Sequence, residues 1–505
     1  MSVSRFNTCA ALAAALMLAG AGSAKAAPVE GLRGAWGSRY SAQSAGTEPL
    51  QLPQVGHDAT ASLQRWNRIA IDASGLDHTP VAAGETRTFG EQLGPGRASR
   101  AMAITHVAMF EALNAIEGGY VSYVGLRRER DRAAPQAAIA QAARDTLVAL
   151  FPSQKAQFDS ALREDLDAVG DRIARAAGIL LGRRAASAIL TRRAADGSQY
   201  VEPRLGTDWF TSDEVGHWRQ DPIGQQPIAL GAHWGEVRPF VLRSGTQFRV
   251  PPPPALASAE YAAAFDEVQR LGGDDITTER TPDQTLIGIY WAYDGTPSLC
   301  APPRLYNQIT MLIADQRGTH GIELARLLAL VNLAMADAGV AIWESKFYYD
   351  LWRPVTGIRE ADEGTGPSGD GDGNPATVGD PTFTPLGAPA SNLTGPNFTP
   401  PFPSYPSGHA GFGGALFETL RRFYRTDTIA FTFVSDELNG VTHDHDGSVR
   451  PLVPRSFTSL SQAEEENGQS RIYLGIHWAF DKTQGIAQGR RVADYVFDHA
   501  LRPQR

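Results

Sequence analysis

The sequence is poor in cysteine and lysine. It has two Cys, Cys9 and Cys300, and only four Lys against 42 Arg. If Cys9 is lost with a leader, Cys300 is the only thiol and an intramolecular disulfide is excluded, so that stability must come from a large core. In a chain that otherwise uses Arg, a compact ammonium group at Lys346 indicates a specific role.

Long hydrophobic runs are missing beyond the N-terminus. Residues 1–26 combine Arg5, an apolar stretch over 9–22 and the small-residue site Ala24-Lys25-Ala26, which predicts a signal peptide. This stretch is short for a membrane span, and no later run reaches the roughly 18 to 20 apolar residues required. We therefore expect an exported protein, periplasmic or extracellular, with no membrane partner.

Positive charge is in deficit. The formal net charge is −9, and removal of residues 1–26 would bring it to −11. An acidic chain is a poor partner for nucleic acid or an anionic membrane. Any cluster of basic side chains is therefore a local feature on a negative background. The sequence does not indicate an oligomeric state.

Apolar residues recur at three- and four-residue spacing through two long regions, which predicts an all-α fold with two helical bundles of the four-helix-bundle type. We expect an extended arm at 27–60, an N-terminal bundle at 61–195 with Ser153 as a helix N-cap, and an irregular Pro- and Gly-rich connection at 196–255. A C-terminal helical domain at 256–505 would hold the active site.

Three short blocks in the C-terminal half carry the chemistry. Residues 346–354, 406–409 and 470–481 together contain one Lys, two Arg, two His and a Ser hydroxyl followed by a Gly N–H. These groups suit a pocket for a tetrahedral oxyanion such as phosphate or vanadate. A helix predicted over 408–424 would add its N-terminus to that pocket.

The spacing of the basic residues predicts where they lie. Lys346 and Arg353 are seven apart, and we expect both on one face, near the end of a helix that runs from 321 to about 351. Arg471 is expected at the entrance of a closing helical region over 472–499, with Gly475 allowing close approach.

His477 and Asp481 are four residues apart and are expected to share a helix face. The carboxylate would then accept the Nδ1 proton and leave Nε2 with its lone pair. This makes His477 either a metal ligand or a nucleophile, and His409 the acid or base opposite it.

In this order the three blocks resemble the signature of the vanadium-dependent haloperoxidases and the phosphatidic acid phosphatase type 2 superfamily. Further segments are similar to the chloroperoxidase-type members: residues 290–295, 302–309, 401–409 and 435–440. The resemblance covers the catalytic half, and the N-terminal half shows little similarity at the level of motifs.

The resemblance implies that vanadate is the cofactor and that Nε2 of His477 bonds its vanadium. The oxygens of vanadate would be held by Lys346, Arg353, Ser407, the Gly408 N–H and Arg471. His409 would be the acid/base for hydrogen peroxide, and Asp294 would brace a basic residue of the site.

The resemblance also implies a halide pocket at Trp343 and Phe402. Bromoperoxidases of the family tend to carry His at the position of Phe402, so the chain leans towards chloride or broad halide use. Hydrogen peroxide, halide and small organic acceptors would be the reactants, and hypohalous acid the product.

The same residues support an alternative, a secreted acid phosphatase inhibited by vanadate. His477 would form a phosphohistidine and His409 would protonate the leaving group, and phosphate could occupy the site of the apoprotein. The Trp343–Phe402 pair and the absence of membrane spans favour the peroxidase. Phe347, Tyr348 and Leu351 depart from the family pattern. A third alternative is an oxyanion-binding protein without turnover.

Two other polar stretches are weaker candidates. The acidic loop 361–380 begins like a calcium loop, but Pro375 and Pro381 stand where an EF-hand needs Gly and Glu, so that only a looser calcium site remains open. His443 and His445 alternate with Asp as in a metal clip, and we interpret this Gly-flanked stretch as a solvated loop.

Overall fold

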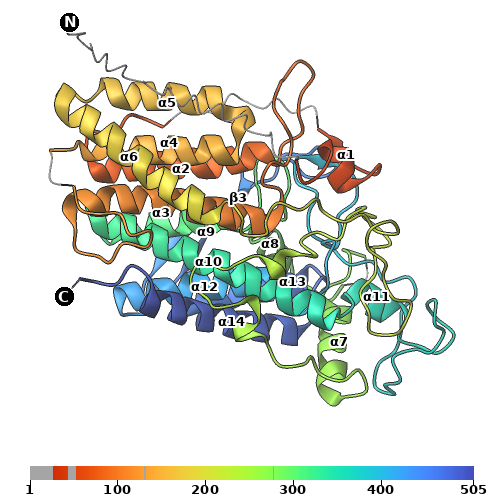
Figure 1. Cartoon of the computed structure of the whole chain (residues 1–505). Coiled ribbons are helices and arrows are strands. Elements are labelled where there is room, and N and C mark those ends of the chain that lie inside the picture. Colours follow the sequence, from red (N-terminus) through yellow and green to blue (C-terminus); the bar gives the residue numbers. More distant parts are fainter. Residues whose placement is uncertain (1–26, 44–52, 130–131, 277, 505) are drawn as a thin grey trace, which may run out of the picture.

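The computed structural model describes residues 27–43, 53–129, 132–276 and 278–504, and the prediction of an all-α fold with two helical bundles is confirmed (Figure 1). The predicted signal peptide at 1–26 lies outside the described residues. The helices of the N-terminal half are α1 (Gly31–Trp36), α2 (Ala59–Asp77), α3 (Gly94–Glu117), α4 (Pro135–Leu150), α5 (Lys155–Asp167) and α6 (Arg172–Arg193).

The C-terminal half begins after a long irregular segment. Between α6 and α7 the structure has only the short 3₁₀ helices η2 (Trp234–Glu236) and η3 (Gly245–Phe248). The later helices are α7 (Ala259–Leu271), α8 (Pro282–Tyr290), α9 (Pro303–Gln316), α10 (Gly321–Tyr349), α11 (Pro354–Arg359), α12 (Gly408–Tyr424), α13 (Leu460–Tyr473) and α14 (Ala479–His499).

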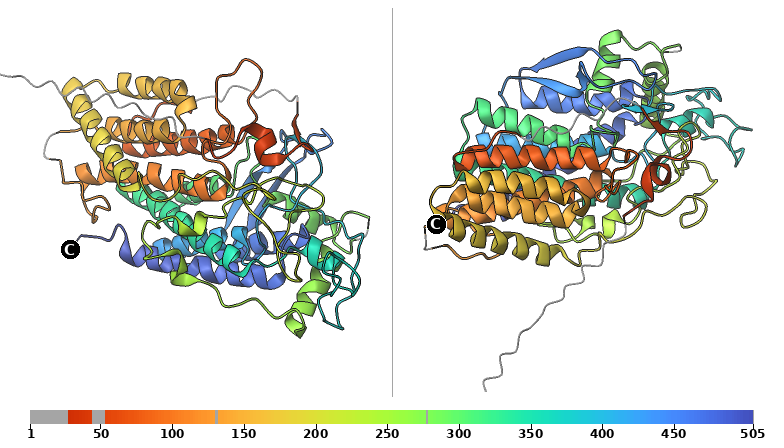
Figure 2. Two further views of the ribbon diagram at one scale, coloured as in Figure 1. Left: turned by 45° about the vertical axis from the view of Figure 1, so that its right-hand side comes forward. Right: turned by 90° about the horizontal axis from the view of Figure 1, so that it is seen from above.

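Helix α10 is the centre of the molecule. It packs against α3 on one side and against α12 and α14 on the other, and Figures 1 and 2 show it between the N-terminal helices and the two blue C-terminal ones. It is long and apolar enough to cross a membrane, yet its most apolar stretch is entirely buried inside the protein. One hydrophobic core therefore runs through both halves of the chain.

Small residues let the helices approach closely. A Cβ added to Gly178 of α6 would lie 2.6 Å from the carbonyl oxygen of Ala134, and one added to Gly485 of α14 would lie 2.7 Å from that of Ser407. Side chains larger than hydrogen do not fit at such contacts. The α4–α6 and α12–α14 pairs are therefore packed backbone against backbone, and the second pair fixes the start of α12.

A β-hairpin in the C-terminal half was not predicted. Strand β3 (Phe431–Asn439) pairs antiparallel with β4 (Leu452–Phe457), and the two-residue strands β1 (Ser41–Ala42) and β2 (Leu393–Thr394) also pair. Residues of β3 are alternately buried and exposed at its start, as expected for a sheet with one face on the core. The loop between β3 and β4 holds His443 and His445, and Asp444 in it pairs with Arg450.

Two predictions about helix ends were wrong. Ser153 is not the N-cap of α5, because it lies in the preceding 3₁₀ helix η1 (Pro152–Gln154) and its hydroxyl donates to Glu91 at 2.8 Å. Arg353 is not on α10, because the chain leaves that helix at Asp350, which has a left-handed backbone at φ 50°. Arg353 is instead the extended N-cap of α11.

The expectation for the last block was also wrong in part. Arg471 lies in the last turn of α13, not at a helix entrance, and the chain then breaks before α14 starts at Ala479. Gly475 in this break has φ 70° and its Cα lies against Gly272, so the predicted close approach at this glycine is confirmed. His477 precedes the N-cap of α14 and therefore does not share a helix face with Asp481.

The N-terminal segment 27–43 is partly packed into the protein. Trp36 at the end of α1 is buried, with its ring 5.2 Å from that of Tyr40 and 4.8 Å from that of Phe398.

In the acidic loop at 361–380, both carboxylate oxygens of the buried Asp372 accept from Thr377 Oγ1. Among the described residues no three His, Cys, Asp or Glu side chains are grouped to hold a metal ion.

Candidate active site

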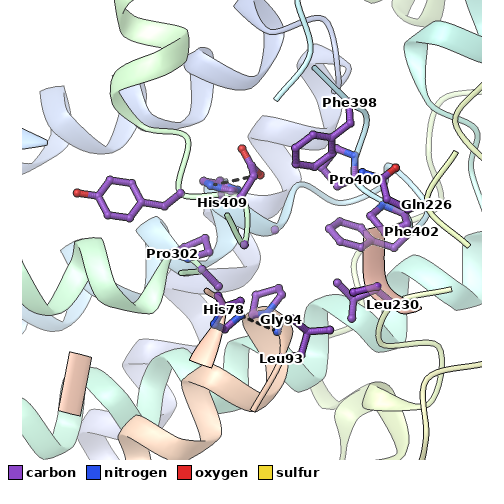
Figure 3. Close-up of a pocket in the computed structure, with 18 of the residues that line it drawn as sticks. His78, Leu93, Gly94, Gln226, Leu230, Pro302, Phe398, Pro400, Phe402 and His409 are labelled. Carbon is purple, nitrogen blue, oxygen red and sulfur yellow. Dashed lines mark hydrogen bonds and ion pairs between the residues drawn. The ribbon is translucent and has the colours of Figure 1, made fainter. Parts of the chain in front are cut away.

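The candidate site is a pocket at which several helices begin or end. Helix α2 ends at Asp77 with His78 as its C-cap, and α3, α9 and α12 begin at Gly94, Pro303 and Gly408. Figure 3 shows His78, Gly94, Pro302 and His409 around this pocket. Three helix N-termini at one cavity direct the positive ends of their dipoles towards it, which favours an anion.

Lys346 reaches the site from the last turn of α10. It is completely buried, and its Nζ donates to the carbonyl oxygens of Pro403 at 2.8 Å and Ser404 at 2.7 Å. Burial, together with the neighbouring Arg353, holds the pKa of Lys346 well below its usual value. An ammonium group has three N–H donors, so one is left for a ligand.

Arg353 is held by main-chain carbonyls although it lies outside α10. Its Nε donates to Phe402 O at 2.9 Å and its Nη1 to Ile476 O at 2.7 Å. The same Nη1 lies 3.0 Å from Nε2 of His477. The two cations predicted to share a helix face are thus brought together by the loop at 402–404.

Arg471 is fixed by a carboxylate, and some of its N–H donors remain without a partner among the described residues. Its Nη2 donates to both oxygens of Asp294, at 2.7 and 2.8 Å. Arg471 is buried, and within the described part of the chain its Nε and Nη1 have no hydrogen-bond partner. Buried N–H groups of a guanidinium without partners are costly, and an oxyanion is the natural acceptor for them.

His477 points its Nε2 at the cations. Its Nδ1 lies 2.7 Å from Asp481 Oδ2, and the main-chain N–H of Trp478 donates to the same oxygen at 3.0 Å. Burial first, and then Arg353, hold the pKa of His477 well below its usual value. The ring is therefore neutral, with Nδ1 protonated and a lone pair on Nε2.

His409 lies in the first turn of α12 and lines the same pocket. Its Nε2 donates to the carbonyl oxygen of Ala292, and it lies 3.9 Å from Asp294 Oδ1. Burial and the neighbouring Arg471 hold the pKa of His409 well below its usual value. The neutral ring keeps a lone pair on Nδ1 and can take up a proton there.

Ser407 and Gly408 form the start of α12, as predicted. Ser407 is the N-cap, and its Oγ accepts from the N–H of Ala410 at 3.4 Å. The N–H of Gly408 belongs to the first turn, where no carbonyl of the helix can accept it. A hydroxyl and a main-chain N–H are thus both placed for a ligand at this end.

The two aromatic residues predicted to line a halide pocket, Trp343 and Phe402, lie side by side. The rings of Trp343 and Phe402 lie 4.9 Å apart, and Trp343 Nε1 donates to Leu230 O at 3.0 Å. Lys346 Nζ lies 5.2 Å and Arg353 Cζ 5.0 Å from the centre of the Phe402 ring. Phe402 therefore lies against both Lys346 and Arg353 at the wall of the pocket.

Several pocket residues were not predicted. They come from the N-terminal arm, the α2–α3 loop and the irregular connection, and they are Trp36, His78, Leu93, Gln226, Ile228 and Leu230. None belongs to a motif, and their placement depends on long-range packing. The one available signal was the high content of Trp and Pro in a connection too long to be a simple linker.

The sequence is similar to known vanadium-dependent enzymes. Residues 326–505 match the family model for the second helical-bundle domain of vanadium chloroperoxidase. The vanadium chloroperoxidase of Curvularia inaequalis is 29% identical over 515 residues, which cover 86% of this chain and 81% of that protein.

Solved structures share the fold. A bacterial vanadium-dependent iodoperoxidase superposes with a TM-score of 0.66 at 24% identity, covering 91% of this chain and 100% of that one. A bacterial vanadium-dependent chloroperoxidase in its apo form gives a TM-score of 0.58 at 16% identity, covering 81% of this chain and 94% of that one.

The fold and the site define a mainly helical protein with a buried cationic pocket suited to a tetrahedral oxyanion, with a neutral histidine at its base. The match of residues 326–505 to a vanadium chloroperoxidase domain, together with the similarity along most of the chain, confirms the resemblance to the vanadium-dependent haloperoxidases that the sequence indicated.

Proposed function

We propose that the protein is a vanadate-dependent haloperoxidase that uses hydrogen peroxide to oxidise chloride or bromide to hypohalous acid. The reaction is X⁻ + H₂O₂ + H⁺ giving HOX and water. The observation that carries the proposal is that two guanidinium nitrogens of Arg471, Nε and Nη1, have no hydrogen-bond partner among the described residues and are buried at the same pocket as His477. The vanadium chloroperoxidase of Curvularia inaequalis supports the peroxidase reading.

The donor set fits vanadate. Nε2 of His477 would bond the metal, and the oxygens would be held by Lys346, Arg353, Ser407, the Gly408 N–H and Arg471. Bound vanadate supplies a Lewis-acidic centre that activates hydrogen peroxide for two-electron oxidation of a halide. The cations compensate the charge of the oxyanion in a site from which water is largely excluded.

The chain's own residues handle the protons and the halide. His409 accepts a proton from hydrogen peroxide at Nδ1 and returns it to the oxygen that leaves as water. Asp294 holds Arg471 in place, and Asp481 keeps the proton of His477 on Nδ1. Trp343 and Phe402 offer the halide an apolar contact beside Lys346. The phenyl ring of Phe402 supports use of chloride as well as bromide.

The test is halogenation of monochlorodimedone by the purified protein with hydrogen peroxide and chloride or bromide, before and after addition of orthovanadate. We expect turnover that depends on vanadate and is lost in His477→Ala. Absence of turnover, together with hydrolysis of p-nitrophenyl phosphate that vanadate inhibits, would instead establish the phosphatase.

We also propose that the protein is exported, on the strength of the leader-like residues 1–26. Mass spectrometry of the protein recovered from culture medium or periplasm tests this, with a mature N-terminus near Ala27 as the expected result. Recovery of the intact chain from the cytoplasm alone would contradict it.

A further inference from the structure

The pocket has a second, neutral end. Beyond Phe402 its walls are apolar and come from Trp36, Ile228, Leu230 and Phe398, with Gln226 among them. Figure 3 shows Gln226 with Phe398, Pro400 and Phe402. The charged side chains that line the pocket, by contrast, are those of the oxyanion site, Asp294 and Arg471.

Gln226 is held through a hydrogen bond to its main chain, whereas its side-chain amide makes no hydrogen bond among the described residues. It is 2% exposed, and its carbonyl oxygen accepts from Gln220 Nε2 at 2.8 Å. In the part of the chain that the structure describes, neither Nε2 nor Oε1 of Gln226 has a hydrogen-bond partner. A buried amide with both ends unpaired is unusual in a folded protein, because such groups are almost always satisfied.

The carboxylate closest in sequence does not serve this amide. Asp221 accepts from the main-chain N–H groups of Ile223 at 2.9 Å, Gly224 at 2.8 Å and Thr399 at 2.9 Å. Three of the roughly four acceptor positions of this carboxylate are therefore taken by main-chain N–H groups, and no hydrogen bond joins it to Gln226 among the described residues. The amide of Gln226 remains the polar group of an otherwise apolar wall.

We propose that Gln226 and the apolar wall around it form a binding subsite for the organic acceptor, and that the acceptor is a neutral phenol. Aromatic and aliphatic walls suit a benzene ring, and a hydroxyl can donate to Oε1 or accept from Nε2. A carboxylate or ammonium acceptor is disfavoured, since among the described residues no charged side chain lines this end of the pocket and the nearby carboxylate of Asp221 is engaged by main-chain N–H groups.

The inference rests on the proposed haloperoxidase function for its chemical consequence. Hypohalous acid formed beside Phe402 meets the bound phenol before it escapes. The oxygen–halogen bond breaks, a carbon–halogen bond forms on the ring, and the proton displaced from that carbon leaves with the hydroxide as water: ArH + HOX gives ArX + H₂O. The ring position that faces Phe402 is halogenated preferentially.

Binding is tested first, without peroxide or halide. Isothermal titration calorimetry with phenol, and with toluene as a comparison of the same shape, is run on the protein, on Gln226→Leu and on the exposed control Gln225→Leu. We expect phenol to bind about five- to tenfold more weakly to Gln226→Leu, as for loss of one buried hydrogen bond, with toluene unaffected and the control unchanged. Equal phenol affinity in all three proteins would overturn the proposal.

Thermal unfolding separates this role from a structural one. A Leu of similar size removes two unpaired polar groups from an apolar wall, so we expect Gln226→Leu to unfold at the same or a higher temperature. A lower unfolding temperature than that of Gln225→Leu would mean that the amide supports the fold, and would count against a ligand role.

Regioselectivity is the third readout, and it depends on turnover. With bromide and hydrogen peroxide, the ratio of para- to ortho-bromophenol from the vanadate-loaded protein should differ from that given by reagent hypobromite, and Gln226→Leu should approach the reagent ratio. An identical ratio for the protein and the reagent would exclude halogenation in the subsite. Failure of turnover altogether would contradict the proposed function, while the calorimetry would still decide whether the subsite exists.

Discussion

The carboxylate of Asp481 decides which nitrogen of His477 is free. It accepts a hydrogen bond from Nδ1 at 2.7 Å, and among the described residues no other side chain hydrogen-bonds to that nitrogen. Loss of such a supporting partner typically weakens metal binding 10- to 100-fold. We therefore predict that Asp481→Asn binds vanadate about 10- to 100-fold more weakly, measured by titrating the apoprotein with orthovanadate.

A matched control lies on the same helix. Asp498 is 55% exposed at the other end of α14 and pairs with Arg422, so Asp498→Asn makes the same chemical change away from the pocket. We expect it to bind vanadate like the unmodified protein. Equal losses in both variants would point to a general effect on α14 and not to the orientation of His477.

Stability should also depend on pH through Asp481. Burial raises the pKa of its carboxyl to about 7 in the folded apoprotein, from an ordinary value of 3.8. The folded state therefore holds this proton more tightly than the unfolded chain, and the resulting stabilisation is full below pH 4 and lost as the pH rises through 7.

The measurable quantity is the difference between the apoprotein and Asp481→Asn. We predict that the free energy of unfolding of the apoprotein, relative to that of Asp481→Asn, falls by about 1 kcal/mol per pH unit between pH 4 and 7. Chemical denaturation of both proteins at about pH 4.5, 5.5, 6.5 and 7.5 tests this prediction. A flat difference would show that the carboxyl titrates as in the unfolded chain.

Among the elements, the contact between α12 and α14 matters most for the site. A Cβ at Gly485 would meet Ser407 O at 2.7 Å and the Cβ of Ala410 at 3.0 Å. We predict that Gly485→Ala pushes the start of α12 away, lowering the free energy of unfolding by about 1–3 kcal/mol and weakening vanadate binding in the same titration. Gly170→Ala, at a position with open space around it, should change neither quantity.

How far the sequence predicts these elements depends on the range of the interactions that set them. The blocks around Lys346, Ser407 and His477 carry local signals, and the structure brings their side chains together. The predicted position of Arg353 on α10 was wrong, although a local signal against it existed. Arg353 precedes Pro354, and a residue before a proline disfavours the helical backbone. The break between α13 and α14 and the place of Gln226 depend on contacts far apart in the sequence, and no local pattern indicates them.

For the whole molecule, the position of α10 predicts that the two halves do not fold separately. The helix is covered by α3 as well as by α12 and α14, so a fragment of residues 256–505 would expose a long apolar face. We predict that this fragment aggregates or lacks a cooperative unfolding transition, measured by calorimetry and size-exclusion chromatography, and that co-expression with residues 27–255 restores a soluble complex. A monomeric fragment that unfolds cooperatively would contradict this.

The cations of the site are oriented mainly by main-chain oxygens: Lys346 by Pro403 and Ser404, and Arg353 by Phe402 and Ile476. A carbonyl is the same in every amino acid, so the identity of the residue that carries it is free to drift as long as the path of the backbone persists. The residue types at these positions are therefore less constrained than their place beside the site would suggest. Positions 403 and 476 can be diversified to reshape the surroundings of the oxyanion while the charges that bind it stay where they are.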